Sequence, residues 1–87
     1  MQFVPTSRPV ALLRKRLVLD TTGNSNSGLY AAMQRGTMVR PVRLGPRAVA
    51  WPSNEIDAVV AARVAGSTEG EIKALVQQLH AQRKQGV

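Results

Sequence analysis

Cysteine is absent from this chain of 87 residues, and aromatic residues are few. The absence of cysteine excludes disulfides and thiolate metal sites. His80 is the only histidine, and Ser25 and Ser27 have no base close to them in sequence, as a nucleophile would need. Phe3, Tyr30 and Trp51 are too few to build a platform on which single-stranded bases stack. We therefore expect no enzyme, no metal and no cofactor.

Long apolar runs are also missing. No stretch approaches the roughly 20 apolar residues that cross a bilayer. The only region that could serve as the core of a signal peptide is interrupted by Arg14-Lys15-Arg16. We expect a cytoplasmic protein, with no membrane partner and no small-molecule ligand.

Acidic residues are scarce in the first part of the chain. Residues 1–51 contain eight lysines and arginines against one aspartate, whereas residues 52–87 contain four charges of each sign, so the whole net charge of +7 lies in the first part. Such a basic segment favours a polyanionic partner, either a nucleic acid or an acidic membrane surface.

A short helical pattern lies in the middle of this basic part. Leu29, Ala32 and Met33 recur at helical spacing and give one apolar face. Ser25 is a good N-cap, and Gly36 can end the helix in the left-handed conformation. About ten helical residues remain between them, which is too short a helix to be stable unless it packs on a neighbour.

The front of this helix carries short polar side chains. Gly23-Asn24 predicts a tight turn before it. Ser25, Asn26 and Ser27 then lie at an exposed helix N-terminus. This layout is typical of the second helix of a helix-turn-helix, whose N-terminal residues meet base edges in the major groove.

A first helix is expected before the turn, within residues 12–22 and after a short extended entry. Val18 and Leu19 would face the core. Arg14-Lys15-Arg16 lies at the helix start, where cations oppose the helix dipole. A nearby phosphate would explain this cluster, and a solvated charge run is the alternative.

A β-hairpin is predicted after the second helix. Apolar residues alternate with other residues over 42–44 and again over 48–51, on either side of Gly45-Pro46-Arg47. Arg43 and Arg47 would lie on this exposed wing. There they either contact a phosphate or the minor groove, or simply face solvent. Trp51 is expected to close the hairpin on the third helix.

The third helix starts near Ser53. One of its faces is apolar and carries Ile56, Val59, Val60 and Val64. Glu55 and Asp57 in the first turn complement the helix dipole. Because residues two apart point to different faces, this pair is not expected to act as catalytic carboxylates.

A fourth helix begins with a capping box formed by Thr68 and Glu71. Its apolar stripe repeats at helical spacing and consists of Ile72, Leu75, Val76 and Leu79. His80 is assigned to the polar face. This helix either packs back on its own domain or pairs with its copy in a dimer.

A basic helix-turn-helix followed by a wing and another helix resembles the AlpA family of phage and prophage regulators. These are small winged-helix proteins related to MerR-type and excisionase DNA-binding domains. The resemblance runs from about Leu12 to Arg63. It is most specific over the stretch Arg40-Pro41-Val42-Arg43-Leu44-Gly45-Pro46-Arg47-Ala48-Val49-Ala50-Trp51, followed by Glu55-Ile56-Asp57-Ala58. The block of the second helix is matched by Thr22-Gly23, Ser25, Ser27, Leu29-Tyr30 and Arg35-Gly36.

The departures from the family pattern fall in that second helix. Asn24 replaces an apolar residue, Gly28 a threonine, and Ala31 an arginine that usually follows the tyrosine. The base preference of the family therefore does not carry over. The resemblance implies that the Tyr30 hydroxyl contacts a phosphate, and a ring half-buried against the wing is the alternative.

The sequence thus predicts a mainly α fold with a small β-hairpin. We expect a flexible arm over residues 1–11, a winged helix-turn-helix over 12–66, and a C-terminal amphipathic helix over 67–87. The expected function is sequence-specific binding of double-stranded DNA as a nucleoid-associated transcriptional regulator. The alternatives are an excisionase-like protein that bends DNA for a recombinase, and a protein-interaction module. The residues expected to contact DNA are Arg14, Lys15, Arg16, Ser25, Asn26, Ser27, Tyr30, Arg35, Arg40, Arg43 and Arg47.

Overall fold

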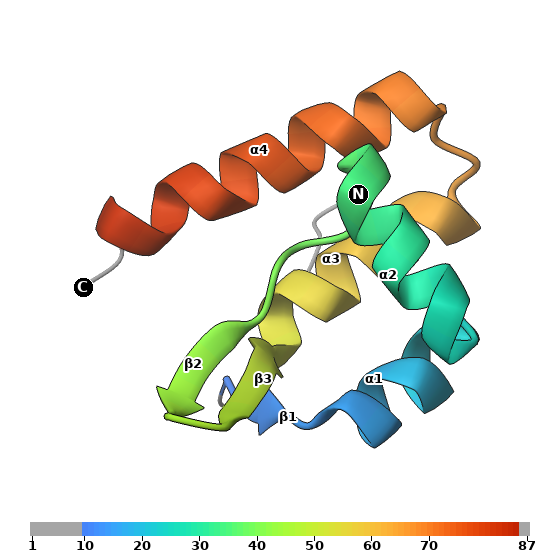
Figure 1. The fold of residues 1–87 in the computed structure, drawn as a ribbon. Coiled ribbons are helices and arrows are strands. Elements are labelled where there is room, and N and C mark those ends of the chain that lie inside the picture. The colour runs from blue at the N-terminus through green and yellow to red at the C-terminus, as the bar shows by residue number, and fades with distance from the viewer. Residues whose placement is uncertain (1–9, 86–87) are drawn as a thin grey trace.

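The structure, a computed structural model, describes residues 10–85 (Figure 1). Its elements follow the order β1 (Leu12–Leu13), α1 (Lys15–Thr22), α2 (Asn26–Arg35), β2 (Val42–Gly45), β3 (Ala48–Pro52), α3 (Ser53–Val64) and α4 (Glu69–Gln85). Helices α1 and α2 form the helix-turn-helix, and β2 and β3 form the wing. The fold is a winged helix-turn-helix, as predicted. No helix in the described range is long and apolar enough to cross a bilayer.

The helix-turn-helix forms through the local signals that the sequence contains. Gly23 follows α1 with φ of 75°, a left-handed conformation that glycine adopts without strain. The hydroxyl of Ser25 caps α2 and accepts from the backbone N–H of Gly28 at 3.1 Å. Gly36, with φ of 83°, ends the helix. The turn and both ends of α2 therefore lie where they were predicted.

The sheet has a third strand that the sequence pattern did not reveal. The strand order is β1-β3-β2, and both neighbouring pairs are antiparallel. Ala11 precedes β1 and extends this pairing, because its N–H donates to Ser53 Oγ at 2.8 Å and its carbonyl accepts from Ser53 N at 2.7 Å. Ala11, which the predicted flexible arm over 1–11 includes, is thus hydrogen-bonded to the first residue of α3. Residues 1–9 of that arm lie outside the described residues.

The wing extends beyond the core. The apolar residues that alternate along its strands are therefore not all buried. Leu44 and Val49 are 45% and 39% exposed, whereas Ala50 and Trp51 are both fully buried. Strand β3 contacts α1 and α3 in addition to its two neighbouring strands, so neighbouring residues at its C-terminal end are both covered. The indole N–H of Trp51 donates to the carbonyl of Val39 at 3.1 Å. Trp51 is thus a core residue, as expected.

Helix α4 packs back on its own chain. Ile72, Val76 and Leu79 are buried in the same cluster as Val18 and Trp51. The apolar stripe of α4 therefore serves the fold, and it is not free for a partner helix or for a second copy. A dimer through residues 67–87 would have to use other surfaces of α4.

Three assignments on α3 and α4 differ from the sequence analysis. Val64 belongs to the apolar face by spacing but lies in the last turn of α3 and is 83% exposed. Glu55 is buried and forms an ion pair with Arg83, so its role extends beyond the helix dipole. His80 is half-buried, and its Nε2 accepts from the backbone N–H of Arg40. Both polar contacts arise because α4 lies across α3 and the segment that precedes β2.

Candidate nucleic-acid interface

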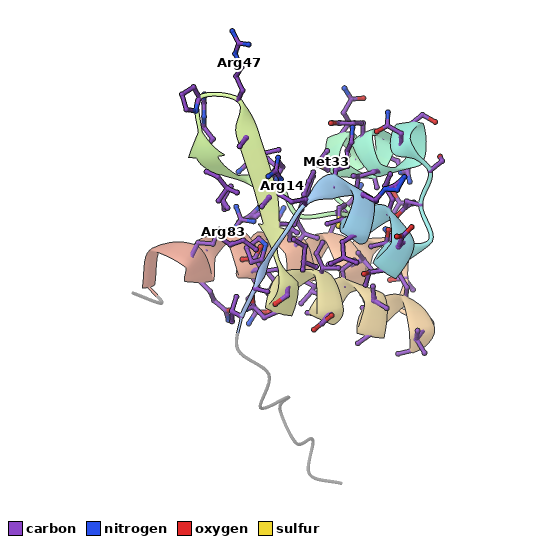
Figure 2. All side chains as sticks on the ribbon, turned by 90° about the horizontal axis from the view of Figure 1, so that it is seen from below. Arg14, Met33, Arg47 and Arg83 are labelled. Carbon is purple, nitrogen blue, oxygen red and sulfur yellow. The ribbon has the colours of Figure 1, made fainter. Side chains whose placement is uncertain are left out.

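Helix α2 and the tip of the wing project from the same side of the molecule, whereas α3 and α4 form the opposite side (Figure 2). Arg47 lies at the tip of the wing and points away from the body. Arg14 and Met33 lie between the wing and α2 in this view. The two elements that were expected to meet DNA therefore share one face, which we call the α2–wing face.

The N-terminal turn of α2 presents its polar side chains to solvent. Ser25, Asn26 and Ser27 are exposed. The Ser25 hydroxyl oxygen accepts a hydrogen bond within the turn, and its hydroxyl hydrogen can still be donated outward. The first turn of a helix also has unpaired backbone N–H groups and a positive dipole end, both of which favour anions.

The start of α1 lies near the second turn of α2. Lys15 Nζ is 5.5 Å from the centre of the Tyr30 ring, a distance at which a cation is attracted to the face of an aromatic ring. Tyr30 is 46% exposed, so its hydroxyl is accessible on this face. Arg14, which precedes α1, and Arg16 are exposed as well. A cation from the start of α1 is thus placed at the Tyr30 ring on α2.

The two arginines of the wing are exposed near its turn. The Arg43 side chain folds over the turn, where Nη2 donates to the carbonyl of Pro46 at 3.4 Å. This contact occupies only one of five guanidinium N–H groups, so the others remain able to donate. Arg47 follows Pro46 and extends from the tip (Figure 2). Both guanidinium groups can therefore reach a phosphate.

Two of the predicted contact residues lie elsewhere. Arg35, at the C-terminal end of α2, lines a hollow of about 320 Å³ between α2, α3 and α4, together with Arg63 and Glu69. Arg40 lies between α2 and β2, and its backbone is bonded to side chains of α4. Neither residue belongs to the tip of the wing or to the N-terminal turn of α2.

The structure also links two departures from the family pattern, which sequence reasoning had left separate. Arg63 Nη1 donates to Asn24 Oδ1 at 3.1 Å, and this orients the Asn24 amide. A Cβ atom at Gly28 would lie 3.3 Å from Asn24 Nδ2 and 3.0 Å from Ser25 Oγ. Glycine at this position therefore leaves room for the asparagine amide. The contact joins residues 39 positions apart, so no local pattern could have revealed it.

Comparison with known proteins agrees with this geometry. Residues 11–64, more than half of the chain, match the family model described as Prophage CP4-57 regulatory protein (AlpA). Comparison with curated proteins and with solved structures gives no match. The matched range contains the helix-turn-helix, the wing and α3, and it ends before α4. The chain belongs to the AlpA family of phage regulatory proteins.

Proposed function

We propose that the protein is a sequence-specific, double-stranded DNA-binding transcriptional regulator of phage or prophage type, acting in the cytoplasm at the nucleoid. The observation that supports this proposal is the α2–wing face. On it, α2 exposes its polar N-terminal residues, Lys15 from the start of α1 lies over the Tyr30 ring of the same helix, and the arginine-bearing wing projects from the same side (Figure 2).

The two kinds of side chain on this face have different roles in the proposal. Asn26 and Ser27 enter the major groove with α2 and read base edges. The cations hold phosphates, which fixes the register of the protein on DNA without reading sequence. They are Arg14, Lys15, Arg16, Arg43 and Arg47.

The electrostatic part is tested by measuring affinity for a duplex at several salt concentrations. Four to six phosphate contacts give a plot of log K against log salt with a slope of about −4 to −5. In the proposal these contacts come from the cations at the start of α1 and on the wing, so we expect a slope in this range. A slope near zero would contradict the proposed phosphate contacts.

The assignment of roles is tested by two substitutions, measured on a selected binding site and on random duplexes. Arg47→Ala should weaken binding to all sequences alike and make the salt slope shallower by about 1. Asn26→Ala should change the preferred bases and leave the salt slope unaltered. Identical behaviour of the two variants would contradict the proposed division.

A second candidate function is suggested by the apolar side chains of the wing. Leu44 and Val49 are exposed on the same hairpin as Arg43 and Arg47. Proteins that bend DNA often combine cations with apolar side chains inserted into the minor groove. An excisionase-like architectural protein would use the wing in this way. A circular-permutation gel assay distinguishes the two, since strong bending that is lost in Leu44→Ala supports the architectural role.

A further inference from the structure

We infer that the C-terminal part of α4 positions the wing, through a set of contacts that we call the wing latch. The latch consists of the side chains of Glu55, His80 and Arg83 and the backbone of Arg40. It sets the direction in which the wing leaves the body of the molecule. The inference rests on the proposed function, because a positioned wing affects binding only if the wing contacts DNA.

The first half of the latch anchors Arg83 to the core. Its Nε donates to Glu55 Oε2 at 2.9 Å, and its Nη2 donates to Glu55 Oε1 at 2.6 Å. Glu55 lies in the first turn of α3 and is only 5% exposed. This two-pronged geometry holds the guanidinium group in one orientation. Arg83 is therefore a fixed point on the body of the protein.

The second half connects this fixed point to the root of the wing. Arg83 Nη2 also donates to the carbonyl of Arg40 at 2.6 Å, and the N–H of Arg40 donates to His80 Nε2 at 3.1 Å. Both backbone polar groups of Arg40 are thus held by side chains of α4. In Figure 2, Arg83 lies near the root of the wing and Arg47 at its tip.

The position of Arg40 explains why these bonds act on the wing. It stands between α2 and β2, and Pro41 follows it with a fixed φ and no N–H. Strand β2 is at the edge of the sheet, paired with β3. The preceding residue, Val39, is held by Trp51. The approach to β2 is therefore fixed by side chains from β3 and α4, and the latch supplies the part from α4.

A latch of this kind changes binding without touching DNA. A wing that is already held in its binding direction loses less conformational entropy when it binds. Arg83 and His80 lie beyond residues 11–64 that match the AlpA family. The matched domain therefore obtains this restraint from a helix outside the match.

The test removes the Glu55–Arg83 part of the latch, and with it the bond to the Arg40 carbonyl, without leaving a buried charge. In the double variant Glu55→Met/Arg83→Met both charges are lost, and such replacement of a buried pair is often neutral for stability. The matched control is Glu69→Met/Lys73→Met, which removes an exposed pair (3.7 Å) from the first turns of the same helix. Should the first variant not fold, His80→Leu removes one latch bond only, and His80→Gln restores an acceptor.

The first measurement needs no DNA. NMR relaxation and residual dipolar couplings report the motion and direction of the wing amides (residues 42–49) relative to α2. We expect the wing to become more mobile or to change direction in the latch variant, and to keep its wild-type values in the control. A wing with wild-type couplings in the latch variant would overturn the inference.

The second measurement connects the latch to binding by a double-mutant cycle on a duplex. Arg47→Ala should weaken binding about tenfold in the wild-type chain and less than about threefold without the latch. An equal loss in both backgrounds would contradict the positioning role. If the wild-type chain does not bind any duplex, the proposed function fails, whereas the NMR measurement still decides whether the latch holds the wing.

Discussion

At the residue scale, Gly28 determines how the side chains of Ser25 and Asn24 are arranged at the N-terminus of α2. Ser25 Oγ accepts from Gly28 N, and the amide of Asn24 lies over the same glycine, held by Arg63. A side chain at position 28 would meet both groups. The small residue thus preserves the cap and the orientation of the amide together.

We predict that Gly28→Ala does not give the usual gain from replacing glycine in a helix. That gain is about 0.5–1 kcal/mol. Here the new Cβ would lie 3.0 Å from Ser25 Oγ, which disturbs a cap worth about 1 kcal/mol. Urea unfolding should show no stabilisation in the wild-type chain. In a Ser25→Ala background, where the cap oxygen is gone, Gly28→Ala should be stabilising. An equal effect in both backgrounds would argue against this contact.

Residues that act on near neighbours could be predicted from the sequence. The Thr68–Glu71 capping box forms in both directions, at 2.8 and 3.1 Å, because its residues are three positions apart. The pairs Glu55–Arg83 and Asn24–Arg63 could not be predicted. Their partners are 28 and 39 positions apart, and only the packing of α3 with α4 and with the turn before α2 brings them together.

At the scale of elements, two faces of α4 make different contacts. Its apolar stripe completes the core, while His80 and Arg83 contact the segment before β2. Burial lowers the pKa of His80 below its ordinary value of 6.5, and the charges of Arg83 and Arg40 lower it further, against an opposite effect of Glu55. The imidazole is therefore neutral near pH 7, as an acceptor at Nε2 must be.

This lowered pKa predicts how stability depends on pH. The unfolded chain takes up a proton near 6.5, whereas folded His80 does so only at lower pH, so the unfolded state binds more protons between the two values. The contribution of neutral His80 is thus complete above pH 6.5 and is lost as the pH falls toward the folded pKa. Urea midpoints between pH 5 and 7.5 should show this loss. In His80→Gln, which keeps an acceptor and does not titrate, the urea midpoint should depend much less on pH over that range. The same pH dependence in this variant would contradict the assignment.

Helices and strands could be predicted where their pattern of apolar residues extends over enough positions. Helices α2 and α4 have clear caps and apolar spacing, and the wing has a turn between two alternating runs. Strand β1 contains only Leu12 and Leu13, which is too short for any periodicity. It is a strand because it pairs with Pro52 and Trp51 of β3, and this pairing depends on the folded arrangement.

At the scale of the whole molecule, one core spans most of the chain. It joins Val18 of α1 and Leu29 of α2 to Val76 and Leu79 of α4. The sequence suggested a boundary near residue 66, because the family resemblance ends at about Arg63 and a new capped helix begins at Thr68. The buried side chains of α4 are nevertheless shared with the helix-turn-helix. Folding of the DNA-binding part should therefore depend on α4.

We predict that a chain ending at Ser67 does not fold cooperatively. It lacks Ile72, Val76 and Leu79, and burial of each such side chain contributes about 1.5–3 kcal/mol. Together they approach the total stability of a small domain, about 5–15 kcal/mol. A thermal melt followed by circular dichroism should lose its sigmoidal transition. A chain ending at Gln85 serves as the control. Cooperative melting of the shorter chain would instead support an independent domain.

At this scale the proposal is that DNA binds to the α2–wing face. The most direct measurement is a ¹H–¹⁵N NMR titration of the full chain with a selected duplex, at moderate salt. We expect the shifted amides to cluster in residues 14–16, 25–30 and 43–49, and the outer surfaces of α3 and α4 to change little. Shifts concentrated on α3 and α4, with an unperturbed wing and α2, would contradict it.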